Sequence, residues 1–223
     1  MTGRVLAVLT GDIKPLGSTT SGIDKVVVPG PQRVERLGIV GDRQADLRVH
    51  GGDDKAVHCY PWSHYEHWRG VFPGHSLLNA PGAFGENLSM EGMDERDVFI
   101  ADRWRIGSTL FQVTQGRQPC FKLNLRFGTR DMATQVQESL RAGWYLRVVE
   151  PGCVSAGDTV ELIERPFPSH SVADLLALIR DRETRADLLA PVLRLPLTAS
   201  WRKLFERRSG SGAVEDWSGR LGR

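Results

Sequence analysis

Cys120 has the neighbours expected of a reactive cysteine. Arg117 precedes it by three residues, Lys122 follows it by two, and Pro119 restrains the backbone directly beside it. Cations near a thiol favour the thiolate, which is the form that ligates metals and attacks electrophiles. A lone cysteine is more often a small buried hydrophobic residue. Here the flanking charges and the proline favour a functional role, as a nucleophile or a metal ligand.

The other two cysteines have no such setting. Cys59 alternates within an apolar strand pattern and is interpreted as structural, and Cys153 lies in a turn with no base near it in sequence. Three cysteines in 223 residues do not form a disulfide framework, and so low a number is typical of a reducing compartment. We therefore expect a soluble cytoplasmic protein.

A second chemical segment runs from Gly41 to Ala56 and combines charged side chains with three glycines. Its candidate donors to an anion are Arg43, Arg48, His50, Lys55 and the backbone amides of Gly51 and Gly52. Carboxylates such as Asp42 could orient these donors. A long polar surface loop is the competing interpretation, because the segment has neither phosphate-loop nor zinc spacing.

The segment Gly82–Leu88 is a glycine turn that holds a carboxylate, Glu86, and an amide, Asn87. On its own this segment is more typical of a structural turn than of a site. Histidines other than His50 are scattered along the chain. His64 and His67 share a predicted helix face, but no carboxylate motif accompanies them, so a zinc site there is not favoured.

The elements that must position these residues are mostly strands. Short apolar runs separated by Gly, Pro and Asp predict a β-barrel or a barrel-like sandwich over residues 1–165. Its expected strands are Arg4–Thr10, Lys25–Val28, Val34–Leu37, Ala56–Tyr60, Arg103–Ile106, Thr109–Thr114, Trp144–Glu150 and Thr159–Ile163. Two helices are expected within it, at Ser63–Arg69 and at Met132–Arg141, the second capped by Asp131 and ended by Gly143.

Two prolines at positions 166 and 168 indicate a boundary, after which the apolar pattern becomes helical. Residues 166–223 are predicted to form a small three-helix domain. Ser171 and Asp174 resemble a capping box at its start, and two further helices are expected at about Glu183–Ala190 and Ala199–Arg208.

Charge and hydropathy exclude some classes of partner. The net charge of +2 is too small to predict nucleic-acid binding, and no apolar run approaches the roughly 20 residues of a membrane helix. We expect neither a nucleic acid nor a membrane as partner. Exposed helices and edge strands are compatible with a homodimer.

Taken together, the three segments resemble a known family. The pattern G-D-x-Q-A-D-x-x-x-H-G-G-x-D-K-A from Gly41, then G-E-N-L from Gly85, then R-x-P-C-x-K from Arg117, is similar to the MOSC domain, named for the C-terminus of molybdenum cofactor sulfurases. Their order and the helical tail resemble its YiiM branch, which is linked to resistance to N-hydroxylated purines.

The resemblance implies a mainly β fold, a MOSC β-barrel with a three-helix C-terminal domain, and a molybdenum–pterin dithiolene cofactor. Cys120 matches the family cysteine expected to ligate the metal, since thiolate is a soft ligand. The catalytic candidates are Cys120, His50 and Glu86, the last two as proton donors or ligand positioners. The residues expected around the pterin and phosphate are Asp42, Arg43, Arg48, His50, Gly51, Gly52, Lys55, Asn87, Arg117, Lys122 and Asn124.

The implied activity is reduction of N-hydroxylated substrates, such as 6-hydroxylaminopurine, to the amine and water. The sequence contains no cysteine cluster for iron–sulfur ligation and no G-x-G-x-x-G fingerprint, so we expect a separate electron-donor reductase of the flavoprotein type.

Three alternatives stay open at this point. Cys120 could carry a persulfide in a sulfur-carrier or cofactor-binding module without its own turnover. The barrel could bind an anion or metabolite without catalysis. The basic C-terminal helices could recruit a partner.

Overall fold

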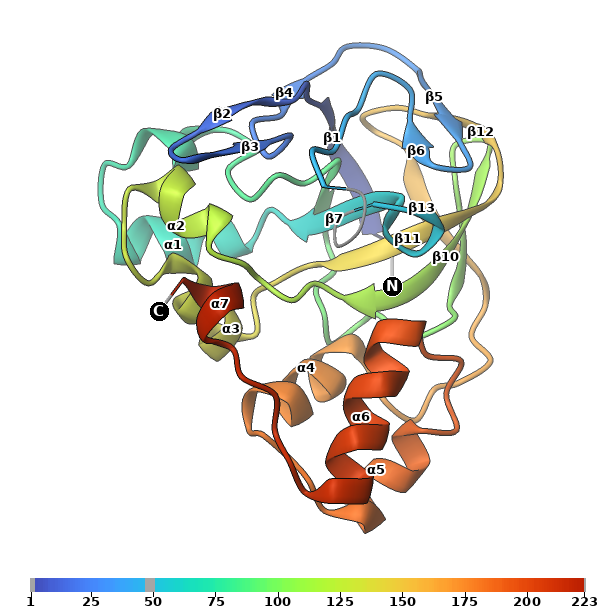
Figure 1. Cartoon of the computed structure of the whole chain (residues 1–223). Coiled ribbons are helices and arrows are strands. Elements are labelled where there is room, and N and C mark those ends of the chain that lie inside the picture. Colours follow the sequence, from blue (N-terminus) through green and yellow to red (C-terminus); the bar gives the residue numbers. More distant parts are fainter. Residues whose placement is uncertain (1–2, 47–50, 223) are drawn as a thin grey trace.

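The computed structural model describes residues 3–46 and 51–222, and seven of its strands close into a barrel (Figure 1). Around the barrel the order is β13, β9, β10, β11, β7, β8 and β1, and β1 pairs with β13 to complete the circle. These strands are β1 Gly3–Thr10, β7 Val57–Pro61, β8 Leu88–Glu91, β9 Arg103–Ile106, β10 Thr109–Gly116, β11 Trp144–Glu150 and β13 Thr159–Glu164. Closure pairs the strand edges that an open sheet would expose, and it confirms the predicted barrel.

Short strands extend the barrel at its rim. β4, Val26–Val27, pairs with the end of β1, and β5, β6 and β12 form a separate three-stranded sheet. A two-stranded ribbon of β2 and β3 approaches α2, where the backbone of Gly17 lies against Leu125. The bounds are β2 Lys14–Leu16, β3 Thr19–Ser21, β5 Gln32–Glu35, β6 Gly38–Ile39, β12 Gly152–Val154 and α2 Lys122–Phe127.

All eight predicted strands correspond to strands of the structure, and two of them, β9 and β11, have the predicted bounds. The prediction missed β8, Leu88–Glu91, because it assigned Leu88 to the end of the glycine turn and placed no strand after it. It also missed α2, which directly follows Cys120. The six residues of that helix complete fewer than two turns, so they show no helical period.

Aromatic side chains pack on both faces of the barrel wall. Trp104 on β9 and Trp144 on β11, the two strands that pair with β10, meet edge to face with ring centroids 6.0 Å apart. Tyr60 stacks on Phe84 with centroids 4.2 Å apart, and both rings are fully buried. Such offset and edge-to-face pairs contribute about 0.5–1.5 kcal/mol each beyond the area that they bury.

The helices flank the barrel and build the C-terminal part. α1 is His64–Val71, η1 is Asp53–Lys55, η2 is Ser76–Asn79 and α3 is Met132–Ser139. Helix α3 starts at Met132 with Asp131 at the N-cap position, as predicted, but the Asp131 side chain makes no capping hydrogen bond. The predicted end was wrong, because the helix is capped by Leu140, which takes the left-handed conformation at φ 59°, before Gly143 is reached.

The C-terminal helices are α4 Val172–Arg180, α5 Ala186–Val192, α6 Ala199–Ser211 and the short α7 Ser218–Leu221. The predicted capping box is present at the start of α4. Helix α4 packs against β10, and Thr198 donates to Gln115 Oε1 at 2.9 Å. Figure 1 shows α4, α5 and α6 below the barrel, whereas α7 returns to the side where α2 and α3 lie. The fourth helix was not predicted. The boundary at residue 165 stays a prediction.

Among residues 3–46 and 51–222, the structure contains no helix that is both long and apolar enough to cross a membrane.

Candidate functional site

An open cavity lies where several loops meet beside β7 and β11. Its lining comes from strands, from the 21–25 and 44–45 segments, and from the loop between β10 and α2. The lining residues are Ser21, Gly22, Ile23, Lys25, Gln44, Ala45, His58, Phe84, Gly85, Asn87, Arg117, Gln118, Cys120, Lys122 and Tyr145. Segments more than 100 residues apart in sequence therefore share one cavity.

Cys120 reaches this cavity because β10 stops at Gly116 and α2 starts at Lys122. The five residues between them form a loop, and the carbonyl of Cys120 accepts from the Leu123 amide at 3.0 Å in the first turn of α2. The thiol is partly exposed, in contrast to that of Cys59, which is fully buried. Burial raises the pKa of the Cys59 thiol well above its usual value, so Cys59 stays an un-ionised core residue.

Arg117 carries a buried positive charge at the cavity wall. Its side chain is 7% exposed, and its Nη1 atom has no hydrogen-bond partner within the described part of the chain. The guanidinium donates to the Tyr145 hydroxyl, and the Arg117 backbone amide donates to the Gly143 carbonyl at 2.9 Å. An unsatisfied buried donor costs about 1–3 kcal/mol, and a charged one costs more. An anion in the cavity would remove that cost.

Three lysines add positive charge. Lys25 and Lys122 line the cavity and are both buried, and Lys55 Nζ lies 6.0 Å from the centroid of the Tyr145 ring. Burial lowers the pKa of Lys25, and the charge of Asp42 opposes this shift. Burial likewise lowers the pKa of Lys55, against the charges of Asp54 and Cys120. The fold thus places desolvated cations around one thiol.

Tyr145 and His58 are cavity residues that the sequence reasoning missed. They face each other in the register of β11 and β7, and their rings lie 5.1 Å apart. Burial, together with the charge of Arg117, lowers the pKa of His58 well below its usual range, so the imidazole is neutral at pH 7. Burial raises the pKa of Tyr145, so its hydroxyl stays protonated. A polar ring residue between two apolar residues, in Val57-His58-Cys59 and in Trp144-Tyr145-Leu146, was the signal that could have indicated both.

Lys25 was also missed as a site residue, and its partner is the predicted Asp42. The Asp42 carboxylate forms a buried ion pair with Lys25 and accepts from the Gly11 amide at 2.9 Å. Asp42 thus acts on the cavity through Lys25. Arg43 lies outside the cavity, with its side chain exposed and 3.5 Å from Asp12. Its backbone instead packs against Gly22.

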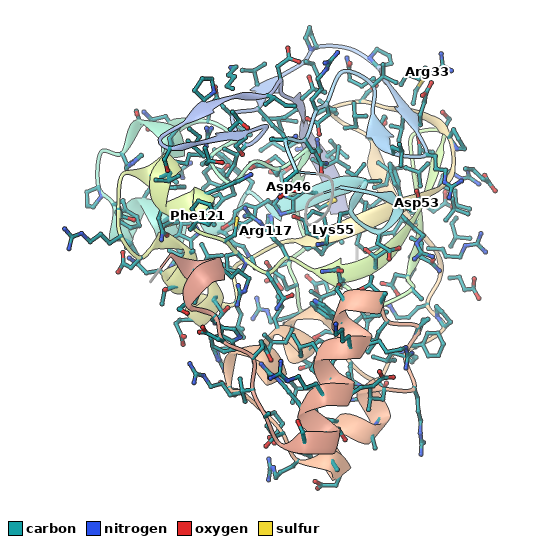
Figure 2. The ribbon with its side chains drawn as sticks, viewed as in Figure 1. Arg33, Asp46, Asp53, Lys55, Arg117 and Phe121 are labelled. Carbon is teal, nitrogen blue, oxygen red and sulfur yellow. The ribbon has the colours of Figure 1, made fainter. Side chains whose placement is uncertain are left out.

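The other predicted residues of the polar segment divide into three groups. Arg48 and His50 lie outside the described residues. Gly51 and Gly52 line a separate surface depression with Arg147. Lys55 lies beside the cavity, with its Nζ atom 6.0 Å from the centroid of the Tyr145 ring, and Figure 2 labels it together with Arg117.

The side chains of Glu86, Asn87 and Asn124 form hydrogen bonds that hold elements of the fold together. The Glu86 carboxylate is fully buried and accepts from Tyr65 Oη at 2.5 Å and from two amides of its own turn. Asn87 lines the cavity, but its side chain joins β7 to β1 by accepting from the His58 amide and donating to the Leu9 carbonyl. The Asn124 side chain joins α2 to α3 and α7. The structure therefore does not place Glu86 or Asn124 on the cavity surface.

Replacing Glu86 with glutamine is expected to lower the free energy of unfolding by about 2–4 kcal/mol, because an amide nitrogen cannot accept from the donors that converge on this carboxylate. The matched control is Glu91→Gln, which removes an exposed pair with Arg4 and should cost no more than about 1 kcal/mol. Chemical denaturation measures both. Equal, small losses in the two variants would contradict the structural role of Glu86.

Comparison with known proteins identifies the class. A family model described as "MOSC domain" matches residues 46–161, which run from the polar segment through β13. The chain is a member of the MOSC-domain family, which is associated with the molybdenum cofactor.

Over nearly its whole length the sequence is similar to that of the Escherichia coli protein YiiM, with 39% identity over 217 residues that cover 96% of each chain. The crystal structure of Escherichia coli YiiM superposes with a TM-score of 0.83 at 34% identity, covering 99% of this chain and 98% of that one. A Gibberella moniliformis protein named "Reductase" is 39% identical over 210 residues, which are 92% of this chain and 37% of that longer protein.

The cavity fits the cofactor of this family. A partly exposed thiol suits a thiophilic metal, and the unpartnered Nη1 of Arg117 together with three lysines suits an anionic pterin phosphate. Cys120 would hold the metal, and Arg117, Lys25, Lys122 and Lys55 would surround the anionic part.

Proposed function

We propose that the protein is a molybdenum-cofactor-dependent reductase of N-hydroxylated bases and related compounds, such as 6-hydroxylaminopurine. The observation that carries the proposal is a thiol and a buried, incompletely paired guanidinium in one cavity. The name of the Gibberella relative supports a reductive role. The substrate class rests on the resemblance to the YiiM branch.

The reaction consumes a hydroxylamine, two electrons and two protons, and it yields an amine and water. When bound, the molybdenum supplies the two-electron chemistry that cleaves the N–O bond. Cys120 provides the protein's ligand to the metal. The four cations bind and orient the anionic cofactor, and they act strongly because the cavity wall is partly desolvated.

Tyr145 is the residue best placed to contact the substrate or cofactor by hydrogen bonding. Its oxygen accepts from Arg117, so its own hydrogen is free to donate into the cavity. Glu86 was predicted as a proton donor, but its carboxylate is enclosed by donors of its own turn and by Tyr65. The role of His50 as a proton donor or ligand positioner stays a prediction, because this residue lies outside the described residues.

The two electrons require a donor, and we propose a separate reductase of the flavoprotein type. The Gibberella relative is consistent with this arrangement, because this chain spans only 37% of its length and leaves room there for further domains.

The test begins with wild-type protein purified from a host that makes molybdenum cofactor. We expect near-stoichiometric molybdenum and pterin, together with reduction of 6-hydroxylaminopurine when reduced methyl viologen supplies electrons. Folded protein without molybdenum or pterin would sink the proposal. A sulfur atom on Cys120, seen by intact mass in metal-free protein, would then favour the persulfide carrier.

A further inference from the structure

The C-terminal residues Trp217–Gly222, named here the C-terminal strap, contact the chain on both sides of Cys120. Arg220 Nη1 donates to the carbonyl of Pro119 at 2.6 Å, and the Arg220 carbonyl accepts from the amide of Phe121 at 2.7 Å. One residue of the strap therefore binds the residue before the cysteine and the residue after it.

Further contacts join the strap to α2 and α3. The carbonyl of Leu221, a fully buried residue, accepts from Asn124 Nδ2 at 2.8 Å. Gly222 has a φ of 74°, and a Cβ atom there would lie 2.9 Å from Phe121 Cβ. Arg220 Nη2 donates to Gln137 Oε1 at 2.6 Å. The strap thus lies directly against the helix that follows Cys120.

The start of the strap is fixed to the C-terminal helices. The Trp217 indole donates to Glu215 Oε1 at 2.7 Å, and the same carboxylate pairs with Arg208 at 2.7 Å. Arg208 is fully buried on α6 and also donates to the Leu178 carbonyl at 2.9 Å. A buried ion pair with good geometry and further hydrogen bonds holds its groups in one arrangement. The strap consequently connects α4 and α6 with the loop that carries Cys120. Figure 1 shows the chain returning from α6 to α7, on the side where α2 and α3 lie.

We propose that Arg220 is a positioning residue that holds the Cys120 loop, so that the helical part of the chain sets the place of the thiol in the cavity. Pro119 has no amide to donate, and its carbonyl is held by a side chain 101 residues away. The role in retaining the cofactor rests on the proposed function, whereas the role in holding the loop does not.

The matched control is an arginine that also donates to backbone carbonyls, but away from the loop that carries Cys120. Arg202 on α6 donates to the carbonyls of Leu193 and Leu195 at 3.2 and 2.9 Å. Arg202→Ala therefore removes two hydrogen bonds to backbone carbonyls without touching the Cys120 loop. Arg220→Ala and Arg220→Lys are compared with it, the lysine variant because one ammonium can restore the contact to Pro119 but lacks the two-armed geometry of the guanidinium.

Hydrogen–deuterium exchange and molybdenum retention are measured on full-length protein, well below the melting temperature of every variant. In Arg220→Ala, the amides of residues 120–125 should exchange about tenfold faster than in wild type, which corresponds to about 1.4 kcal/mol of local opening. Molybdenum loss on dilution should accelerate by a similar factor. Arg220→Lys should recover part of both effects, and Arg202→Ala should leave both within about twofold of wild type.

Equal exchange in Arg220→Ala and Arg202→Ala would overturn the inference, because Arg220 would then contribute only general stability. Faster exchange with unchanged molybdenum loss would overturn it too, since the loop would loosen without moving the thiol. Wild type that contains no molybdenum would count against the proposed function instead, and the exchange comparison alone would then decide whether Arg220 holds the loop.

Discussion

Cys120→Ser protein is expected to fold normally, to lose its molybdenum and to lose about a thousandfold in hydroxylamine reduction, equivalent to about 4 kcal/mol of transition-state stabilisation. A serine hydroxyl is a hard ligand that stays protonated at neutral pH, so it cannot replace a soft thiolate. The fold should tolerate the change because the Cys120 side chain is partly exposed. Molybdenum per chain, measured by mass spectrometry, and the rate of amine formation check this expectation.

Cys153→Ser is the control for this experiment. Cys153 is an exposed cysteine on β12 and does not line the cavity. Its backbone amide donates to Ser108 Oγ at 2.8 Å. Its replacement should leave metal content and activity unchanged. Full molybdenum content in Cys120→Ser would contradict ligation by this thiol and would move the metal site elsewhere in the cavity.

Arg117→Met is expected to weaken cofactor binding without lowering the stability of the cofactor-free protein. Without cofactor, the variant should be as stable as wild type or more so, because a buried and incompletely paired charge is replaced by an apolar chain of similar length. Affinity for the cofactor should fall by about a hundredfold, or about 2.7 kcal/mol, because a charge-assisted contact to the anion is lost. Thermal unfolding of metal-free protein and cofactor content after dilution measure the two effects.

Arg208→Met provides the comparison. This arginine is also fully buried, but Glu215 and the carbonyls of Leu178 and Ile179 use its guanidinium. Its loss leaves a partly buried carboxylate unpaired and should lower the free energy of unfolding by about 3–5 kcal/mol. If Arg117→Met destabilised metal-free protein as strongly as Arg208→Met does, the guanidinium of Arg117 would be a structural group and not a site for an anion.

The two arginines show what local sequence could and could not indicate. Both lie among ordinary polar residues, and neither neighbourhood shows which guanidinium is paired. Arg117 was selected because it precedes Cys120, whereas Arg208 was named only as the last residue of a predicted helix. The difference between them depends on Glu215, which reaches Arg208 after the chain has reversed direction at Gly212.

The sequence by itself determined eight of the strands and the capping box of α4, and it indicated Cys120 through its neighbours. These features depend on near neighbours: alternation along a strand, a serine three residues before an aspartate, and a proline beside a cysteine. The barrel and its class followed from three short motifs in the right order. Which side chains of those motifs enter the cavity did not follow from them.

Only the tertiary structure decided that His58 and Tyr145 meet across two strands, that Lys25 replaces Arg43 in the cavity, and that the C-terminal strap contacts the Cys120 loop. The motifs also contain Glu86, and Asn124 lies two residues beyond the third of them; the polar atoms of both residues hold the fold together instead. The physical reason is that a buried polar group must find a partner. Strand register and chain reversal determine which partner is within reach, and both depend on residues up to 101 positions away.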